Sequence, residues 1–264
     1  MYHSGSTVEL FDKKVRDNSV KILERLSINI ANAEKLIDIQ CNIASYFVGW
    51  WCSNTRFAVR DNELNSILFS AFHKNIISLY STLRLTICGL YGPARPLMRT
   101  IFEWLMISKF SCIANDPSVI QKWHNEETIY FSNSVLKKIK DPSPDEFYTF
   151  WSVVCDYSHA TRSSLQISLD VEDEENFREI SINIAVLNAL LECNYHLLNT
   201  HLITAEYEYM GKFYYSSRFS AARDYKLPEL RKEAHSIFKN NRKFLGSGSA
   251  KLISAYKRKW RLSV

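Results

Sequence analysis

Glycine and proline are scarce in this sequence, with seven glycines and six prolines among 264 residues. Both residues punctuate turns, so their scarcity disfavours a sheet of many short strands and favours long helices joined by short links. Aromatic residues (13%) can fill the gaps between such helices, and an apolar content of 46% is ordinary for a folded protein. A chain of this length can bury a large core, as one domain or two.

The sequence also lacks the familiar short signatures of catalysis and metal binding. It contains no G-x-S-x-G, no phosphate-binding P-loop and no H-E-x-x-H. Its six cysteines include no C-x-x-C pair. His196 and His201 are five residues apart, which places them on different faces of a helix and not together on a metal. We therefore expect no metal site and no cofactor.

No segment is typical of a secretion signal or of a membrane span. Residues 1–14 lack a basic stretch followed by an apolar one. The longest stretch without charge, residues 39–55, is interrupted by polar side chains. Scattered thiols in a chain of this length indicate a reducing compartment. We therefore expect a cytoplasmic protein with no integral membrane span.

Apolar residues recur at helical spacing along most of the chain, which predicts an all-α protein, a multi-helix bundle. The predicted helices cover residues 8–33, 36–51, 63–90, 93–113, 117–140, 144–159, 178–210 and 226–245. Residues 161–176 are expected to form a loop between helices. Residues 250–264 are either a last basic helix or a partly disordered end.

Positive charge is concentrated near the C-terminus. Residues 226–264 carry eleven Lys or Arg and two Glu, a net charge of +9, so the preceding residues sum to −4 of the total of +5. A mildly acidic body thus ends in a basic segment, and such segments often bind nucleic acid or anionic surfaces. We predict a helical bundle domain at 1–225 and a basic C-terminal helical extension at 226–264.

Three charged residues, Arg95, Arg99 and Glu103, are embedded in the apolar run 93–110. Their four-residue spacing stacks them on one face of a helix. One interpretation is a polar site in which Arg99 binds phosphate or stabilises transition-state charge and Glu103 orients it. The alternative is a ladder of intrahelical salt bridges, each worth about 0.3–0.5 kcal/mol, without chemistry. The apolar neighbours favour burial, which calls for polar partners elsewhere in the fold.

A second polar cluster is predicted where the helix over 144–159 ends, at Asp156, Ser158, His159 and Arg162. The helix dipole favours the charged form of a histidine near a helix C-terminus, and such a histidine could act as a general acid or base near neutral pH. A capping or hydrogen-bonded structural histidine is the alternative. His159 is nevertheless the first choice among the seven histidines, and we expect it to meet Arg99.

The end of the basic extension, YKRKWRLSV, joins cations to aromatic rings. Cations attract phosphates, and rings can stack on bases. We therefore predict nucleic-acid contacts from Lys257, Arg258, Lys259, Trp260 and Arg261, to which Arg95 and Arg162 would contribute. A solvated end of the chain, an anionic membrane surface or an acidic partner protein are the alternatives that the pattern leaves open.

Residues 75–162 resemble a family of bacterial all-helical proteins with an R-x-x-x-E helix and a later helix that ends in Ser-His. Here the motifs are Arg99 with Glu103 and Ser158 with His159. Such proteins look like relatives of the HEPN superfamily, helical bundles often found in toxin–antitoxin and anti-phage defence systems. Active HEPN proteins are ribonucleases whose Arg and His converge, often across a dimer. The resemblance implies an HEPN-like core with additional N- and C-terminal helices, and a homodimer.

The usual HEPN signature has four to six residues between an Arg and a following His on one helix, and none of the seven histidines here has such an arginine. Either Arg99 and His159 meet from separate helices, or the fold is kept without the nuclease. Two functions follow as expectations. One is an RNA-binding protein of a bacterial defence or toxin-type system that cleaves RNA without a metal, through Arg99, Glu103 and His159. The other is a non-catalytic adaptor that binds a partner protein in a defence complex, or nucleic acid, through its basic tail.

Overall fold

A computed structural model describes residues 7–58, 63–113, 118–139, 144–155, 170–199 and 217–258 of the chain. Within these ranges every regular element is helical, which confirms the all-α bundle. The elements are α1 (Thr7–Ala58), α2 (Glu63–Ile87), α3 (Tyr91–Ile113), α4 (Ser118–His124), α5 (Phe131–Ser134), the 3-10 turn η1 (Leu136–Lys138), α6 (Pro144–Cys155), α8 (Glu174–Leu197), α10 (Ser217–Asn241) and α11 (Ser247–Lys257).

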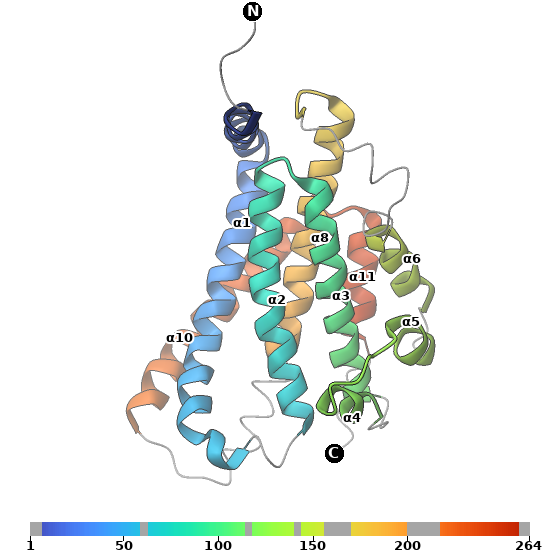
Figure 1. Cartoon of the computed structure of the whole chain (residues 1–264). Helices are drawn as coiled ribbons and strands as arrows, with labels where there is room; N and C mark the ends of the chain where they lie inside the picture. The colour runs from blue at the N-terminus through green and yellow to red at the C-terminus, as the bar shows by residue number, and fades with distance from the viewer. Residues whose placement is uncertain are drawn as a thin grey trace, which may run out of the picture.

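The long helices α1, α2, α3 and α8 lie side by side and form the body of the bundle (Figure 1). Helix α8 is the central element, because it packs against α1, α2, α3 and α11. Its side chains are buried over most of its length, with Ile180, Leu187 and Leu191 fully enclosed. A helix that is buried on several sides needs internal partners for its polar residues, and this requirement shapes much of the fold.

The two C-terminal helices pack on the bundle. Helix α10 lies against α1, and α11 lies against α8 and α6 (Figure 1). Leu227 and Phe238 of α10 and Tyr256 of α11 belong to the same hydrophobic core as the residues of α1–α8. Residues on both sides of position 225, where the sequence predicted a boundary between bundle and extension, therefore share one core.

Several predicted helix boundaries differ from the structure. Helix α10 begins at Ser217, before the start predicted at 226, and α8 begins at Glu174, before the start predicted at 178. The helices expected over 8–33 and 36–51 are one helix, α1, whose backbone departs from helical geometry at Leu26. The helix expected over 117–140 is divided into α4, α5 and η1. The chain leaves the helix after α4 at Glu126, which has a φ of 57°. The division lets Phe131 reach the core, where its ring lies 6.1 Å from that of Phe102, so tertiary packing overrides local helix preference.

Gly89 ends α2 and turns the chain into α3. Its N–H donates to the carbonyl of Thr86 at 3.0 Å, and the next N–H, from Leu90, donates to Leu85 at 2.9 Å. This pair of bonds is the Schellman ending of a helix, and it requires the left-handed backbone that Gly89 adopts with a φ of 79°. A β-carbon at this position would lie 2.9 Å from Nδ2 of the buried Asn18.

Replacement of Gly89 by alanine is expected to lower the free energy of unfolding by about 2 kcal/mol. The left-handed backbone costs an L-residue about 1–2 kcal/mol, and the new methyl group also crowds the side chains of Asn18 and Val171. Denaturant unfolding measures the change. Gly248→Ala is the matched control, because a β-carbon there meets nothing within 4 Å. Equal stability of the two variants would contradict this account of the turn.

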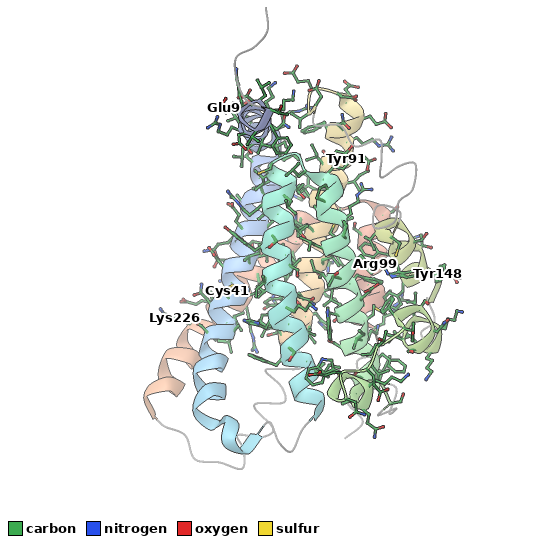
Figure 2. All side chains as sticks on the ribbon, in the orientation of Figure 1. Glu9, Cys41, Tyr91, Arg99, Tyr148 and Lys226 are labelled. Carbon is green, nitrogen blue, oxygen red and sulfur yellow. The ribbon has the colours of Figure 1, made fainter. Side chains whose placement is uncertain are left out.

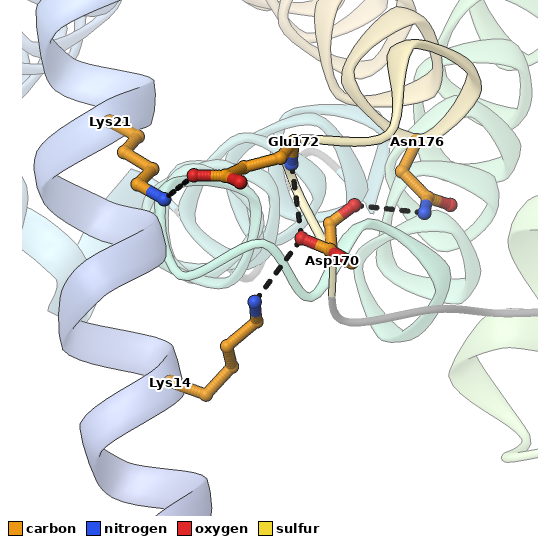
Figure 3. Close-up of polar contacts among 5 residues, drawn as sticks. All are labelled: Lys14, Lys21, Asp170, Glu172 and Asn176. Carbon is orange, nitrogen blue, oxygen red and sulfur yellow. Dashed lines mark hydrogen bonds and ion pairs between the residues drawn. The ribbon is translucent and has the colours of Figure 1, made fainter.

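A polar cluster links the first part of α1 to the turn that precedes α8 (Figure 3). Lys14 pairs with Asp170 at 3.2 Å, and Lys21 pairs with Glu172. The backbone N–H of Glu172 and the Lys14 ammonium lower the pKa of Asp170, while the hydrogen bond to Glu172 raises the pKa of Lys21. These side chains are exposed, so the pairs orient the turn and add little stability.

Two further properties of the described helices concern their cysteines and their apolar character. Cysteines 41, 88, 112, 155 and 193 carry free thiols. Over the described residues, no helix combines the length and the apolar character needed to cross a membrane.

Candidate functional site

Arg99 and Glu103 pair with each other on the side of α3 that faces α6 (Figure 2). Nε of Arg99 donates to Oε1 of Glu103 at 2.8 Å, across one turn of the helix. The two side chains are 27% and 23% exposed, so the pair is partly covered and still reachable from solvent. The four-residue spacing in the sequence therefore produced the predicted ion pair.

Trp151 of α6 completes this cluster. Its indole N–H donates to the same Oε1 of Glu103 at 3.2 Å, and its ring centroid lies 5.7 Å from Cζ of Arg99. Phe150, the preceding residue, packs on Phe102 of α3 with ring centroids 4.9 Å apart. These neighbouring aromatic contacts hold α6 against α3, so that the Glu103 carboxylate receives donors from both helices. We call Arg99, Glu103 and Trp151 the α3–α6 cluster.

The electrostatics of the α3–α6 cluster favour a permanently charged guanidinium. Partial burial alone would lower the pKa of Arg99, but the hydrogen bond and negative charge of Glu103, together with nearby Cys155, raise it above its usual value. A fixed cation at a partly exposed position can bind an anionic group such as a phosphate. Glu103 offsets part of that charge and fixes the orientation of the guanidinium.

The predicted partners of Arg99 from the second polar cluster, Asp156, Ser158, His159 and Arg162, lie outside the described residues. Cys155, where α6 ends, is close enough to Arg99 to affect its pKa. Three residues separate Cys155 from His159 in the sequence. The meeting of Arg99 with His159 thus stays a prediction.

Arg95 was expected to contact nucleic acid, and its position argues against that role. The residue is 5% exposed. Its Nε donates to Oδ1 of Asn183 at 2.9 Å, and its terminal nitrogen pairs with Glu179. Both partners belong to α8, so Arg95 joins α3 to α8 within the core and is not presented to a ligand. The apolar surroundings of the 93–110 run were the sequence signal for this burial.

The two tail cations that the structure describes are also engaged. Lys257 pairs with the buried Glu192 of α8, and Arg258 pairs with Glu146 of α6 at 3.1 Å. These ion pairs fix the end of α11 on the bundle and offset charge that the sequence assigned to phosphate binding. Lys259, Trp260 and Arg261 lie outside the described residues.

Sequence reasoning missed a buried lysine, Lys109 of α3, which has no exposed surface. Its ammonium donates to the carbonyls of Ala255 at 2.7 Å and Tyr256 at 3.1 Å, in the last turn of α11. The Ala255 carbonyl also accepts from the backbone N–H of Arg258 at 3.3 Å, and a cation beside the last carbonyls of a helix complements the helix dipole. A lysine in the apolar end of α3 was the signal that could have revealed this role.

The neighbouring His196 of α8 is held neutral. Burial lowers its pKa to about 4, and the charges of Lys257 and Lys109 act in the same direction. Its ring packs edge-on against Tyr256, with centroids 6.1 Å apart. At neutral pH His196 is therefore uncharged, and its ring packs between helices.

A network of side-chain amides runs through the core along α8. Asn194 donates to Oε1 of Gln40 at 3.0 Å and accepts a hydrogen bond from Asn75 at 3.2 Å. Gln40 in turn donates to the Leu191 carbonyl at 3.1 Å. Helices α1, α2 and α8 are thereby joined in one register. The asparagines were visible in the sequence only as interruptions of an apolar run.

The described part of the chain contains no group of three or more His, Cys, Asp or Glu side chains placed to hold a metal ion. Comparisons with protein-family models, with curated proteins and with solved structures find no match to the chain.

Proposed function

We propose that the protein binds RNA and cleaves it without a metal, as an HEPN-like member of a bacterial defence or toxin-type system. The observation that carries the proposal is the partly exposed Arg99 guanidinium, oriented by Glu103 beside the end of α6. The sequence continues from that end to His159 in four steps. An oriented cation and a nearby imidazole are the two groups that this chemistry needs.

In the proposed reaction the 2′-oxygen of the RNA attacks the adjacent phosphorus, and its proton passes to the His159 imidazole. The bond between phosphorus and the 5′-oxygen breaks, and the leaving oxygen receives a proton from the imidazolium. Arg99 stabilises the negative charge that develops on the non-bridging oxygens. The products are a 2′,3′-cyclic phosphate and a 5′-hydroxyl. Glu103 acts as a positioning residue that fixes the guanidinium.

Replacement of Arg99 by alanine is expected to slow RNA cleavage by about 100- to 1,000-fold, the usual cost of removing one donor to a developing oxyanion. The free energy of unfolding should fall by about 1 kcal/mol or less, because the lost ion pair is partly exposed. Cleavage of a labelled RNA in the presence of EDTA measures the first effect, and denaturant unfolding the second.

The exposed Arg84, at the end of α2, provides the control, and Arg84→Ala should cleave at the wild-type rate. A 2′-deoxy substitution at the cleaved position should abolish cleavage, since the attacking oxygen is then missing. A folded Arg99→Ala variant with full activity would show that Arg99 has no part in the mechanism, and would contradict the proposal.

One observation favours the second candidate, a non-catalytic helical adaptor that binds a partner protein or nucleic acid. The Glu103 carboxylate already receives N–H donors from Arg99 and Trp151, so the α3–α6 cluster also serves as a bond between two helices. For an adaptor, Glu103→Ala lowers the free energy of unfolding by about 1–2 kcal/mol, less than the 3–5 kcal/mol of a fully buried pair. Wild-type protein that binds RNA or a partner without any cleavage would favour this function.

A further inference from the structure

The charges of α10 are divided between two sides of the helix. With about 100° of rotation per residue, the basic side chains of α10 from position 231 to its end fall within an arc of about 100°. This α10 basic face consists of Arg231, Lys232, His235 and Lys239 of α10, together with Arg242 and Lys243 in the turn that follows its last residue. Glu229 and Glu233 lie off this face, and Glu233 pairs with Lys35 of α1 at 3.3 Å.

The α10 basic face is exposed and largely free of ion pairs. Lys232, Lys239 and Lys243 are exposed, and within the described ranges none of them forms an ion pair. Arg242 approaches Glu192 at 3.8 Å but remains 65% exposed. In this respect the face differs from the end of α11, where Lys257 and Arg258 are both paired with carboxylates.

Arg231 is the least exposed member of the face, since it is only partly exposed and its Nε is buried. It lies near the Tyr195 hydroxyl, a group that is 4% exposed and whose pKa burial raises to about 12, so that it stays neutral. Neither Nε of Arg231 nor the Tyr195 hydroxyl has a hydrogen-bond partner in the described structure. His235 packs edge-on against Tyr195, with ring centroids 5.9 Å apart. Because Nε of Arg231 is buried, the exposed lysines and not Arg231 supply the accessible charge of the face.

The rest of α10 anchors the basic face to the bundle. Leu227 and Phe238 are buried in the core. At the end of the helix, Asn241 donates to Asn188 of α8 at 2.8 Å and accepts from Asn32 of α1 at 2.7 Å. The helical part of the face, positions 231–241, spans about 15 Å at the rise of an α-helix. A rigid row of cations of this length matches several successive charges of a polyanion.

We infer that the α10 basic face, and not the end of α11, is the surface on which a nucleic-acid phosphate backbone lies. The inference rests on the proposed RNA function but does not need its catalytic step. The charge of the face suits either phosphates or an acidic protein. Protein interfaces usually have an apolar centre, and none of the residues that form this face is apolar, so phosphates are the better match. Phe244, 51% exposed, follows the face and can stack on a base.

The test compares two triple variants with the same change in charge. Lys232→Gln, Lys239→Gln and Lys243→Gln remove three cations from the α10 basic face. Lys13→Gln, Lys137→Gln and Lys226→Gln remove three exposed cations elsewhere, including one from the same helix. Fluorescence anisotropy with labelled single-stranded RNA and DNA of about 20 nucleotides gives the Kd over a range of salt concentrations. Thermal melting verifies that both variants fold.

The α10 variant is expected to bind RNA about 10- to 100-fold more weakly than wild type at low salt. Its plot of log K against log salt should be less steep by about 2, since each lost phosphate contact removes about 0.7 from the slope. The control should bind within about twofold of wild type. Equal losses of affinity for RNA and DNA would show that the face recognises the phosphate backbone. A loss of affinity for RNA alone would show that it also recognises the 2′-hydroxyl.

Equal binding by the two triple variants would overturn the inference, as would wild-type protein that binds polyglutamate or anionic vesicles but no nucleic acid. The cleavage assay separates this result from the proposed function. If wild type binds through α10 and never cleaves, the catalytic proposal fails and the inference stands. If the α10 variant binds and cleaves like wild type, the inference fails and the catalytic proposal stands.

Discussion

Replacement of Asn194 by aspartate is expected to lower the free energy of unfolding by about 3 kcal/mol or more at pH 7. Asn194 is completely buried, and its amide N–H donates to Gln40 while its oxygen accepts from Asn75. Aspartate keeps the shape of the side chain but replaces the donor with an acceptor. A carboxylate oxygen would then face the Gln40 oxygen in the core of the bundle.

This penalty should depend on pH in a defined direction. Burial raises the pKa of a carboxyl above its value of about 3.9 in the unfolded chain, so the folded variant binds a proton more readily than the unfolded one. The free energy of unfolding of Asn194→Asp should therefore recover, relative to wild type, as the pH falls from 7 towards 5. Denaturant unfolding at several pH values measures this change.

Asn133→Asp provides the matched control, since Asn133 is exposed on α5. It should change the free energy of unfolding by no more than about 0.5 kcal/mol. An Asn194→Asp variant as stable as this control at pH 7 would show that the amide network does not join α1, α2 and α8.

Replacement of Lys109 by alanine is expected to cost about 3–5 kcal/mol, the typical penalty for removing one member of a buried charged network. Two carbonyls in the last turn of α11 lose the charged donor that Lys109 supplies, and the lysine stem leaves a cavity beside Phe147, whose ring centroid lies 5.0 Å from the ammonium. Denaturant unfolding measures the loss. Hydrogen exchange should show that the amides of α11 lose more protection than those of α2.

Lys74→Ala is the control for this experiment. Lys74 is exposed on α2, where its ammonium lies 5.0 Å from the ring centroid of Trp104. Its removal should cost about 0.5–1 kcal/mol, the value of a cation–π contact at an exposed site. If α11 keeps its protection in Lys109→Ala, the lysine does not hold that helix on the bundle.

Local patterns predicted the elements best where one physical cause controls them. The apolar stripe of α2 and the Gly89 ending defined that helix closely, because periodicity and backbone freedom are local properties. The proline and acidic residues at the start of α6 were equally direct signals. The segment after α4 was harder to predict, because Phe131 enters the core only by ending a helix that the local sequence would allow to continue.

In the candidate site, too, contacts within one helix could be predicted from the sequence and contacts between helices could not. The pairing of Arg99 with Glu103 follows from their spacing on one helix. The indole of Trp151 could not be assigned to Glu103 from the sequence, since the two residues are 48 positions apart and only the packing of α6 on α3 brings them together. Arg95 is likewise buried because Glu179 and Asn183 of α8, distant in the sequence, bind its guanidinium.

By itself the sequence determined that this protein is all helical, where most of its helices lie, and that its positive charge gathers near the C-terminus. Composition and periodicity act on neighbouring residues, so they can be recognised without a fold. Only the tertiary structure decided which charges are exposed and which are paired, because burial and ion pairing depend on segments far apart in the chain. In the folded protein Lys257 and Arg258 lie against carboxylates, whereas Lys232, Lys239 and Lys243 are exposed on the α10 basic face.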